Sequence, residues 1–142
     1  MCLSAAPAWF SRRLRPSNAE VGEAGERLAA RLLRRSGLRV LGRRVSTSQG
    51  EIDLVALEAG QLVCVEVKTS LRAPQSVWRP GDRFDRKSFE RQRRAAKALA
   101  KTGLGAAATL RLDLIEVWIG PAGSRPRLLH HRDLRRPISS AE

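Results

Sequence analysis

Apolar positions near the start of the chain recur with the spacing of a helix. They are Val21, Ala24, Leu28 and Leu32, three or four residues apart. Residues 17–20 are Ser-Asn-Ala-Glu, and a Ser followed three residues later by Glu is the capping-box signature of a helix start. Gly37 supplies the stop. Gly22 and Gly25 fall inside this helix, where each costs about 0.5–1 kcal/mol relative to Ala, so we expect a neighbour to approach the backbone closely there.

Further along, the apolar residues follow the alternation or the short continuous runs of β-strands. The predicted strands span residues 38–45, 50–57, 62–69 and 109–119, with a short edge strand at 128–131. Alternation in the fourth strand changes phase near Leu114, which predicts a β-bulge there. Residues 84–101 predict a second helix, and residues 71–82, with two Pro and one Gly, predict a loop. The order αβββαβ, with the extra strand, predicts an α/β fold in which a mixed sheet is flanked by helices.

The length of 142 residues is enough for one hydrophobic core. We expect a flexible basic N-terminal tail at residues 1–16, a single domain at 17–135 and a C-terminal tail at 136–142. No apolar run approaches the ~20 residues of a membrane-spanning helix. The apolar patch at residues 3–10 precedes a cluster of arginines, which reverses the order of a signal peptide. We therefore expect a cytoplasmic protein with no membrane contact.

The charge balance is strongly basic. The chain has 27 Lys and Arg residues against 14 Asp and Glu residues, which gives a net charge of +13. Such a field attracts polyanions, and nucleic acid is the commonest polyanion for a protein of this class. The competing interpretation is that arginine richness reflects genome composition. Charge and layout together favour nucleic acid, with DNA as the expected partner.

Cysteine and histidine predict no metal site of their own. Cys2 and Cys64 are isolated from each other and form neither a disulfide framework nor a zinc motif. His130 and His131 are adjacent, so on a strand they point to opposite faces. We expect them to be surface histidines near a strand end.

Three ionisable residues lie inside runs that are otherwise typical of buried strands. They are Asp53, Glu66 and Lys68. Charged side chains rarely occupy such positions without a partner or a task. If Ala59 and Gly60 form a two-residue turn, Asp53 stands directly opposite Glu66. A four-residue loop from Glu58 to Gln61 would keep the same register. Lys68 projects from the same face of its strand as Glu66. Two opposed carboxylates repel each other unless a cation lies between them.

Carboxylate oxygens in this arrangement suit Mg²⁺ or Mn²⁺, which retain waters and recruit phosphate oxygens. The metal can activate water against a phosphodiester, while Lys68 orients that water or stabilises the developing negative charge. The competing interpretation is an exposed hairpin with an ordinary Glu66–Lys68 neighbour pair. The apolar flanks favour burial and therefore a shared site.

A fourth carboxylate is expected from the first helix. Glu26 shares a helix face with small residues that let the helix lie close to the sheet, so it could reach the metal or its water shell. Glu20 and Glu23 compete for this role, and an acidic first turn is also favoured by the helix dipole alone. Glu51 is expected to be structural.

These motifs together resemble a known family. Gly25-Glu26, residues 50–56 (Gly-Glu-Ile-Asp-Leu-Val-Ala) and residues 65–69 (Val-Glu-Val-Lys-Thr) are similar to the YraN-like family of uncharacterised bacterial proteins, and the similarity covers residues 18–134. That family is similar to the restriction-endonuclease-like superfamily, whose PD-(D/E)xK core is related to archaeal Holliday junction resolvases. Ser70 and Arg44 depart from the family pattern, which has Arg and Asn there.

The resemblance implies a nuclease fold with Asp53, Glu66 and Lys68 in the catalytic positions and Glu26 in the position of a helical glutamate. Asp53, Glu66 and Glu26 would then be the metal ligands, with Mg²⁺ or Mn²⁺ as the cofactor. It also implies that a homodimer is one expected assembly.

The second helix supplies a candidate nucleic-acid surface. Its basic residues include Arg86, Lys87, Arg91, Arg94 and Lys97. A solvated helix face whose arginine stems cover apolar surface is the competing interpretation. Gln92 on this helix is a weaker candidate for the site, and Trp78 before it could stack on a base or pack on the core.

The function predicted first is metal-dependent phosphodiester hydrolysis on DNA in repair or recombination. The alternative is a catalytically weak or inactive nucleic-acid-binding protein on a nuclease fold. A third hypothesis is a basic accessory protein whose partner is another protein or ribosomal RNA.

Overall fold

The computed structural model describes residues 16–71, 79–103, 109–121 and 123–138. In chain order the elements are α1 (Asn18–Arg35), β1 (Arg39–Thr47), β2 (Gly50–Glu58), β3 (Gln61–Ser70), the 3₁₀ turn η2 (Pro80–Arg83), α2 (Arg86–Ala100), β4 (Leu110–Trp118) and β5 (Arg127–His131). This order confirms the predicted α/β fold, including the extra strand. Residues 1–15 and 139–142 of the predicted tails, and Trp78, lie outside the described residues.

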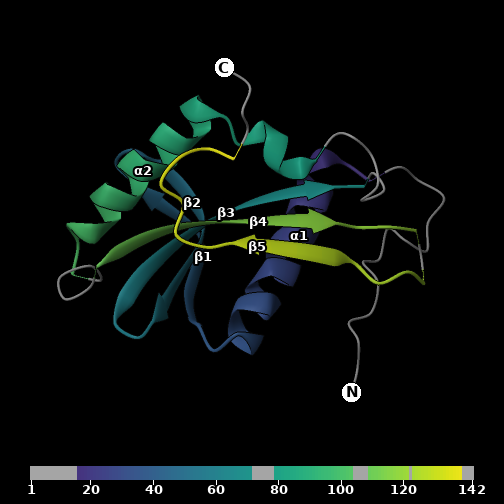
Figure 1. Cartoon of the computed structure of the whole chain (residues 1–142), viewed down its shortest axis with the longest axis horizontal. Coiled ribbons are helices and arrows are strands. Elements are labelled where there is room, and N and C mark those ends of the chain that lie inside the picture. The colour runs from purple at the N-terminus through teal and green to yellow at the C-terminus, as the bar shows by residue number, and fades with distance from the viewer. Residues whose placement is uncertain (1–15, 72–78, 104–108, 122, 139–142) are drawn as a thin grey trace.

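The five strands form one mixed sheet in the order β1-β2-β3-β4-β5 (Figure 1). β1, β2 and β3 form an antiparallel meander, β3 and β4 are parallel, and β5 runs antiparallel to β4 at the edge. The parallel pair needs a crossover, and α2 supplies it. No helix in the described part of the chain has the length and apolarity to cross a bilayer.

The two helices cover opposite faces of the sheet. The α1 side of the core is built on Ala29 and Leu33 and includes Val63, Val65 and Val67 of β3. On the α2 side, Phe89, Ala96 and Leu99 pack with alternate residues of the sheet, including Cys64 of β3. Because successive strand residues point to opposite faces, β3 serves both cores and is buried along most of its length.

Helix α1 begins and ends where the sequence predicts. The Ser17 hydroxyl accepts a hydrogen bond from the Glu20 backbone N–H, and the Glu20 carboxylate accepts one from the Ser17 backbone N–H. Gly37 follows the helix with φ +90°, a conformation that glycine adopts without strain. The predicted capping box and stop are both confirmed.

Of the two connections considered for β2 and β3, the structure has the two-residue turn. Ala59 and Gly60 have φ values of 49° and 77°, the positive pair typical of a type I′ hairpin. Glu58 pairs with Gln61, and the register continues to Leu54 opposite Val65. Asp53 and Glu66 lie one residue beyond the last of these pairs.

The predicted bulge near Leu114 is wrong. The β3–β4 pairing runs without a shift from Leu110 to Trp118, and the register shift lies instead in β1, between Val40 and Gly42. β4 pairs with β3 and β5 and is buried on both faces from Arg111 onward. Both of its faces carry apolar residues for that reason, and the change of phase reflects two-sided burial.

Close approach of α1 to the sheet occurs at Gly25 and not at Gly22. A Cβ built on Gly25 would lie 2.8 Å from Thr69 Cβ and overlap the Thr69 hydroxyl, whereas one built on Gly22 would meet nothing within 4 Å. The absence of a side chain at residue 25 therefore allows α1 to rest on the end of β3, next to Lys68.

We expect Gly25→Ala and Gly22→Ala to change stability in opposite directions. Gly25→Ala forces α1 away from Thr69 and should lower the free energy of unfolding by about 1–3 kcal/mol. Gly22→Ala removes only backbone freedom and should raise it by about 0.5–1 kcal/mol. Urea unfolding followed by circular dichroism measures both, and equal effects of the two substitutions would contradict the close packing at residue 25.

Candidate functional site

Backbone pairing between β2 and β3 ends next to Asp53, and the Asp53 side chain makes the next contact between the two strands. Pairing of the two strands extends from the turn as far as Leu54 and Val65. One residue further along β2, Asp53 Oδ2 accepts a hydrogen bond from the Val67 backbone N–H at 2.9 Å. The aspartate thus takes the place of a backbone acceptor and lies against β3 at the residue between Glu66 and Lys68.

Glu66 and Lys68 form an ion pair beside this contact. Lys68 Nζ lies 2.8 Å from Glu66 Oε1, and the two side chains are only 18% and 13% exposed. Their neighbours Val65 and Val67 pack beneath α1, so Glu66 and Lys68 project toward the α2 side. The neighbour pair anticipated as an alternative does form, but it is largely buried, unlike an ordinary surface pair.

The electrostatic environment opposes ionisation of Asp53. Burial and the negative charge of Glu66 raise the pKa of Asp53 to about 7, with a further contribution from Glu26. The hydrogen bond from the Val67 N–H and the positive charge of Lys68 lower the pKa of Asp53, but by less than burial and Glu66 raise it. Negative charge therefore accumulates here, and an added cation would relieve it.

Glu26 is the acidic residue of α1 whose charge contributes to this environment. Its side chain is 12% exposed, and its Oε2 lies 3.0 Å from Arg44 Nε. The two competing candidates have other partners: Glu20 caps the helix and Glu23 pairs with Arg27 on the surface. Of the three acidic residues considered, Glu26 is the one positioned toward the sheet, and Arg44 is its ion-pair partner.

The acidic side chains of the site are few. Within the described ranges, no cluster of three or more His, Cys, Asp or Glu side chains is arranged to hold a metal ion. Mg²⁺ is commonly bound through one or two carboxylates and completes its shell with water and substrate phosphate oxygens. Asp53 and Glu66 are two carboxylates close to the same stretch of β3, and Lys68 is the cation paired with Glu66.

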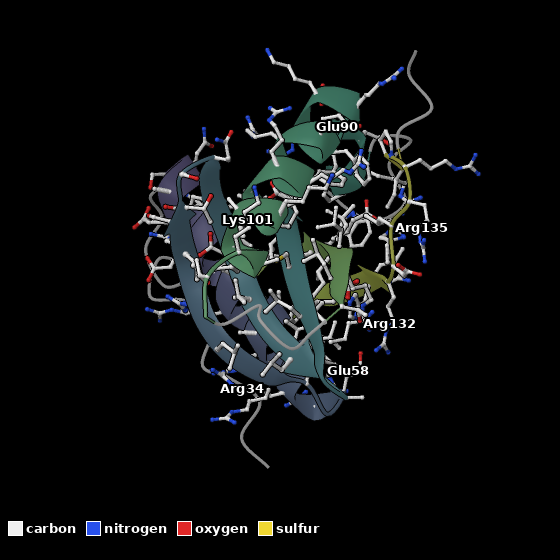
Figure 2. All side chains as sticks on the ribbon, turned by 90° about the vertical axis from the view of Figure 1, so that its left-hand side faces the viewer. Arg34, Glu58, Glu90, Lys101, Arg132 and Arg135 are labelled. Carbon is white, nitrogen blue, oxygen red and sulfur yellow. The ribbon has the colours of Figure 1, made fainter. Side chains whose placement is uncertain are left out.

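The basic residues of α2 are solvent-exposed. The five predicted contacts, Arg86, Lys87, Arg91, Arg94 and Lys97, all lie on its outer surface. Lys97 and Arg93 also line a groove of about 610 Å³ between α2, the start of β4 and the segment around Arg135. Figure 2 shows Glu90 and Lys101 toward opposite ends of this helix, and Arg135 on the chain segment beside it. The helix thus offers an extended cationic surface.

Gln92 does not share that exposure. It is 3% exposed, and its Nε2 has no hydrogen-bond partner among the residues that the structure describes. Its place in the buried stripe of α2 agrees with a residue directed toward the sheet. Whether it enters the site stays a prediction.

A buried ionic network at the turn end of the sheet was not predicted. Asp113 of β4 is fully buried, and both of its oxygens accept hydrogen bonds from Arg111 at 2.9 Å. Arg111 also contacts Glu58 at 2.6 Å, and Arg132 pairs with Glu58 beside it (Figure 2). His130 Nε2 lies 2.7 Å from Asp113 Oδ2.

These contacts determine the ionisation of Asp113. Burial alone would raise its pKa, but hydrogen bonds from His130, Arg111 and the Asp133 backbone N–H together hold the pKa of Asp113 below its ordinary value. The carboxylate is therefore charged and compensated, in contrast to Asp53. The sequence signal available was the presence of Arg111 and Asp113 within an apolar strand.

Glu116 is a second buried acid of β4, on the opposite face of the sheet. Its carboxylate contacts Arg79, the Gly81 backbone N–H and His131. The prediction that His130 and His131 face opposite sides is confirmed, because they contact acids on different faces. The prediction that they are surface histidines is wrong: their side chains are 11% and 22% exposed, and each is directed at a fully buried carboxylate.

Comparison with known proteins places the same residues in a bacterial family. The model of the uncharacterised protein family UPF0102 matches residues 25–117, a range that contains Asp53, Glu66, Lys68 and Glu26. A UPF0102 protein of Rhodopirellula baltica is 40% identical over 119 residues, covering 80% of this chain and 68% of that protein. One from Symbiobacterium thermophilum is 42% identical over 116 residues, covering 78% of this chain and 93% of that protein. One from Moorella thermoacetica is 39% identical over 99 residues, covering 69% and 80% respectively.

The raised pKa of Asp53 gives Asp53→Asn a pH-dependent effect on stability. The native carboxyl has a pKa of about 7, whereas an unfolded aspartate titrates near ~3.9. Between these values the native state binds the extra proton, so wild-type stability falls as the pH rises, and above about pH 7 the full cost is present. Asparagine keeps the acceptor for Val67 without the charge.

We therefore expect Asp53→Asn to raise the free energy of unfolding by roughly 1–3 kcal/mol above pH 7. The gain should vanish as the pH falls toward roughly 4, because both forms are then neutral. Urea unfolding of wild type and variant across this pH range measures the difference, and a difference that does not change with pH would contradict the proposed environment of Asp53.

Proposed function

This chain belongs to the uncharacterised protein family UPF0102, and we propose that it catalyses metal-dependent hydrolysis of phosphodiester bonds in DNA. The observation that carries the proposal is the contact of the Asp53 carboxylate with the β3 backbone at Val67. This contact sets Asp53 beside the ion pair of Glu66 and Lys68. Two carboxylates and one ammonium group at the end of a strand pair are the residue types that this chemistry requires.

Asp53 and Glu66 would hold Mg²⁺ or Mn²⁺, with Glu26 contributing through the hydration shell. When bound, such an ion polarises a phosphodiester and lowers the pKa of a water that attacks it. Holding the ion through Glu66 would compete with the ion pair between Glu66 and Lys68, and the Lys68 ammonium would then be free to contact the phosphate. Lys68 then stabilises the negative charge that develops on the phosphate oxygens.

The electrostatic surface supports a nucleic-acid substrate. Helix α2 exposes its basic residues. It covers the face of the sheet toward which Glu66 and Lys68 project. Lysine and arginine contacts to phosphate set affinity and carry no base information. We expect DNA recognition by structure during repair or recombination, in the cytoplasm, with a homodimer as one arrangement that could span a branched substrate.

One observation favours the second candidate function, nucleic-acid binding with little or no turnover. The 2.8 Å ion pair between Glu66 and Lys68 satisfies the glutamate, and a satisfied carboxylate is a weaker metal ligand. The two candidates differ in whether divalent metal displaces this pair.

Cleavage assays on a DNA panel separate the candidates. Linear, nicked, flapped and four-way DNA would be incubated with Mg²⁺ or Mn²⁺ and wild-type protein, Asp53→Asn, Glu66→Gln or Lys68→Ala. We expect metal-dependent cleavage by the wild type and a loss of roughly 10²–10³-fold in each variant, as for removal of one charge-stabilising group. Mg²⁺ should also raise the Tm of the wild type more than that of Asp53→Asn.

Glu51→Gln is the matched control, because Glu51 is an exposed acid of the same strand. It should cleave as the wild type does. DNA binding that persists in all variants, with no cleavage by the wild type, would establish the second candidate. Cleavage that survives in Asp53→Asn would refute the proposed site.

A further inference from the structure

The position of Glu116 places a second charged cluster next to Lys68. In the parallel β3–β4 pair Lys68 is opposite Glu116, and the two strands of such a pair lie about 4.8 Å apart with opposed side chains on one face. Glu116 is therefore in the strand beside Lys68, on the same side of the sheet. Lys68 nevertheless pairs with Glu66, so Glu116 must be neutralised from elsewhere.

The residues that neutralise Glu116 come from the η2 turn and from β5. Its Oε1 accepts a hydrogen bond from the Gly81 backbone N–H at 2.7 Å. Its Oε2 contacts the Arg79 guanidinium and lies 2.7 Å from His131 Nε2. With 0% exposure, the carboxylate is satisfied entirely by protein groups, as a buried charge must be.

The same contacts fix the turn at the site. A Cβ on Gly81 would lie 2.5 Å from Glu116 Oε1. The close contact between the turn and the carboxylate therefore depends on the absence of a side chain at residue 81. The Arg79 backbone N–H donates to Asp82 Oδ2 at 2.7 Å. Arg83 Nη2 donates to the Thr69 carbonyl, next to Lys68, at 2.6 Å. The turn is thereby attached to both β3 and β4.

Arg79 combines a buried anchor with an exposed surface. Its contacts with Glu116 and His131 both use Nη2, while 40% of its side chain is exposed, against none for Glu116. A guanidinium has five N–H donors in a rigid plane, so the exposed part presents donors in a fixed direction. Among the residues that the structure describes, no exposed basic side chain of α2 pairs with a buried acid, so these side chains lose more entropy on binding.

We propose that Arg79 forms a phosphate-binding subsite beside Asp53, Glu66 and Lys68, with Glu116 as the residue that positions it. The ligand is a phosphodiester of the nucleic-acid backbone neighbouring the one that reaches the metal site. This inference rests on the proposed function for the role of the adjacent site, but binding at Arg79 does not require cleavage. Arginine suits the role because it pairs with phosphate through two parallel hydrogen bonds.

The test measures binding apart from catalysis. A fluorescently labelled four-way DNA junction and a linear duplex would be titrated with protein in Ca²⁺ over a range of salt concentrations. Arg79→Ala should weaken binding roughly tenfold and reduce the slope of log K against log salt by about 0.9. Arg79→Lys keeps the charge and should recover part of the affinity. Arg34→Ala, an exposed arginine on α1 across the sheet, is the matched control and should bind as the wild type does.

Loss of Arg79 also leaves the Glu116 carboxylate less compensated, which could itself repel phosphate. The double variant Arg79→Ala/Glu116→Gln removes that charge, and we expect its binding to remain weak. Thermal unfolding of every variant verifies that the titrations are made on folded protein. Binding restored in the double variant, or an Arg79→Ala effect no larger than that of Arg34→Ala, would overturn the subsite.

Cleavage assays of the same variants in Mg²⁺ distinguish the two proposals. Arg79-dependent binding by a wild type that cleaves nothing would refute the nuclease and leave the subsite standing. If the wild type cleaves DNA but its binding does not depend on Arg79, the nuclease proposal stands and the subsite is refuted. Failure of the wild type to bind either DNA would refute the subsite.

Discussion

The hydrogen bond from the Val67 backbone N–H to Asp53 Oδ2 joins the sheet to the candidate site. Backbone pairing of β2 and β3 extends only to Leu54 and Val65, and the aspartate continues the contact with its side chain. A carboxylate in that role must be partly buried next to Glu66, which costs stability. The proposed metal chemistry uses the same placement, so the cost in stability and the proposed chemistry have one origin.

Much of this geometry could be predicted from short-range patterns. The Ser17–Glu20 capping box and the Ala59-Gly60 turn depend on neighbours in sequence, and a two-residue turn fixes the pairing of every later residue of the hairpin. The opposition of Asp53 and Glu66 follows from that register. Close approach to the backbone was expected at both glycines of the first helix, and it occurs at Gly25 but not at Gly22, because the cost of a helical glycine does not say which one packs on a neighbour.

The remaining features depend on contacts between distant segments. β4 is buried on both faces, so apolar residues occur on both sides of the strand. The order of its apolar and polar residues therefore does not indicate which face is buried, and the change of phase at Leu114 does not mark a bulge. Glu116 receives its partners from a turn before α2 and from β5. A strand pattern records that an acid is buried but not which groups compensate it, because those groups are fixed only when the elements pack.

The adjacent histidines of β5 have a consequence for the edge of the sheet. His130 meets Asp113 on one face and His131 meets Glu116 on the other. A slip of β5 by one residue along β4 would turn both imidazoles away from their acids at once and leave two desolvated carboxylates with fewer partners. The two histidines therefore fix the register of β5 against β4. They oppose sliding of this edge strand and its exchange with a strand of another chain.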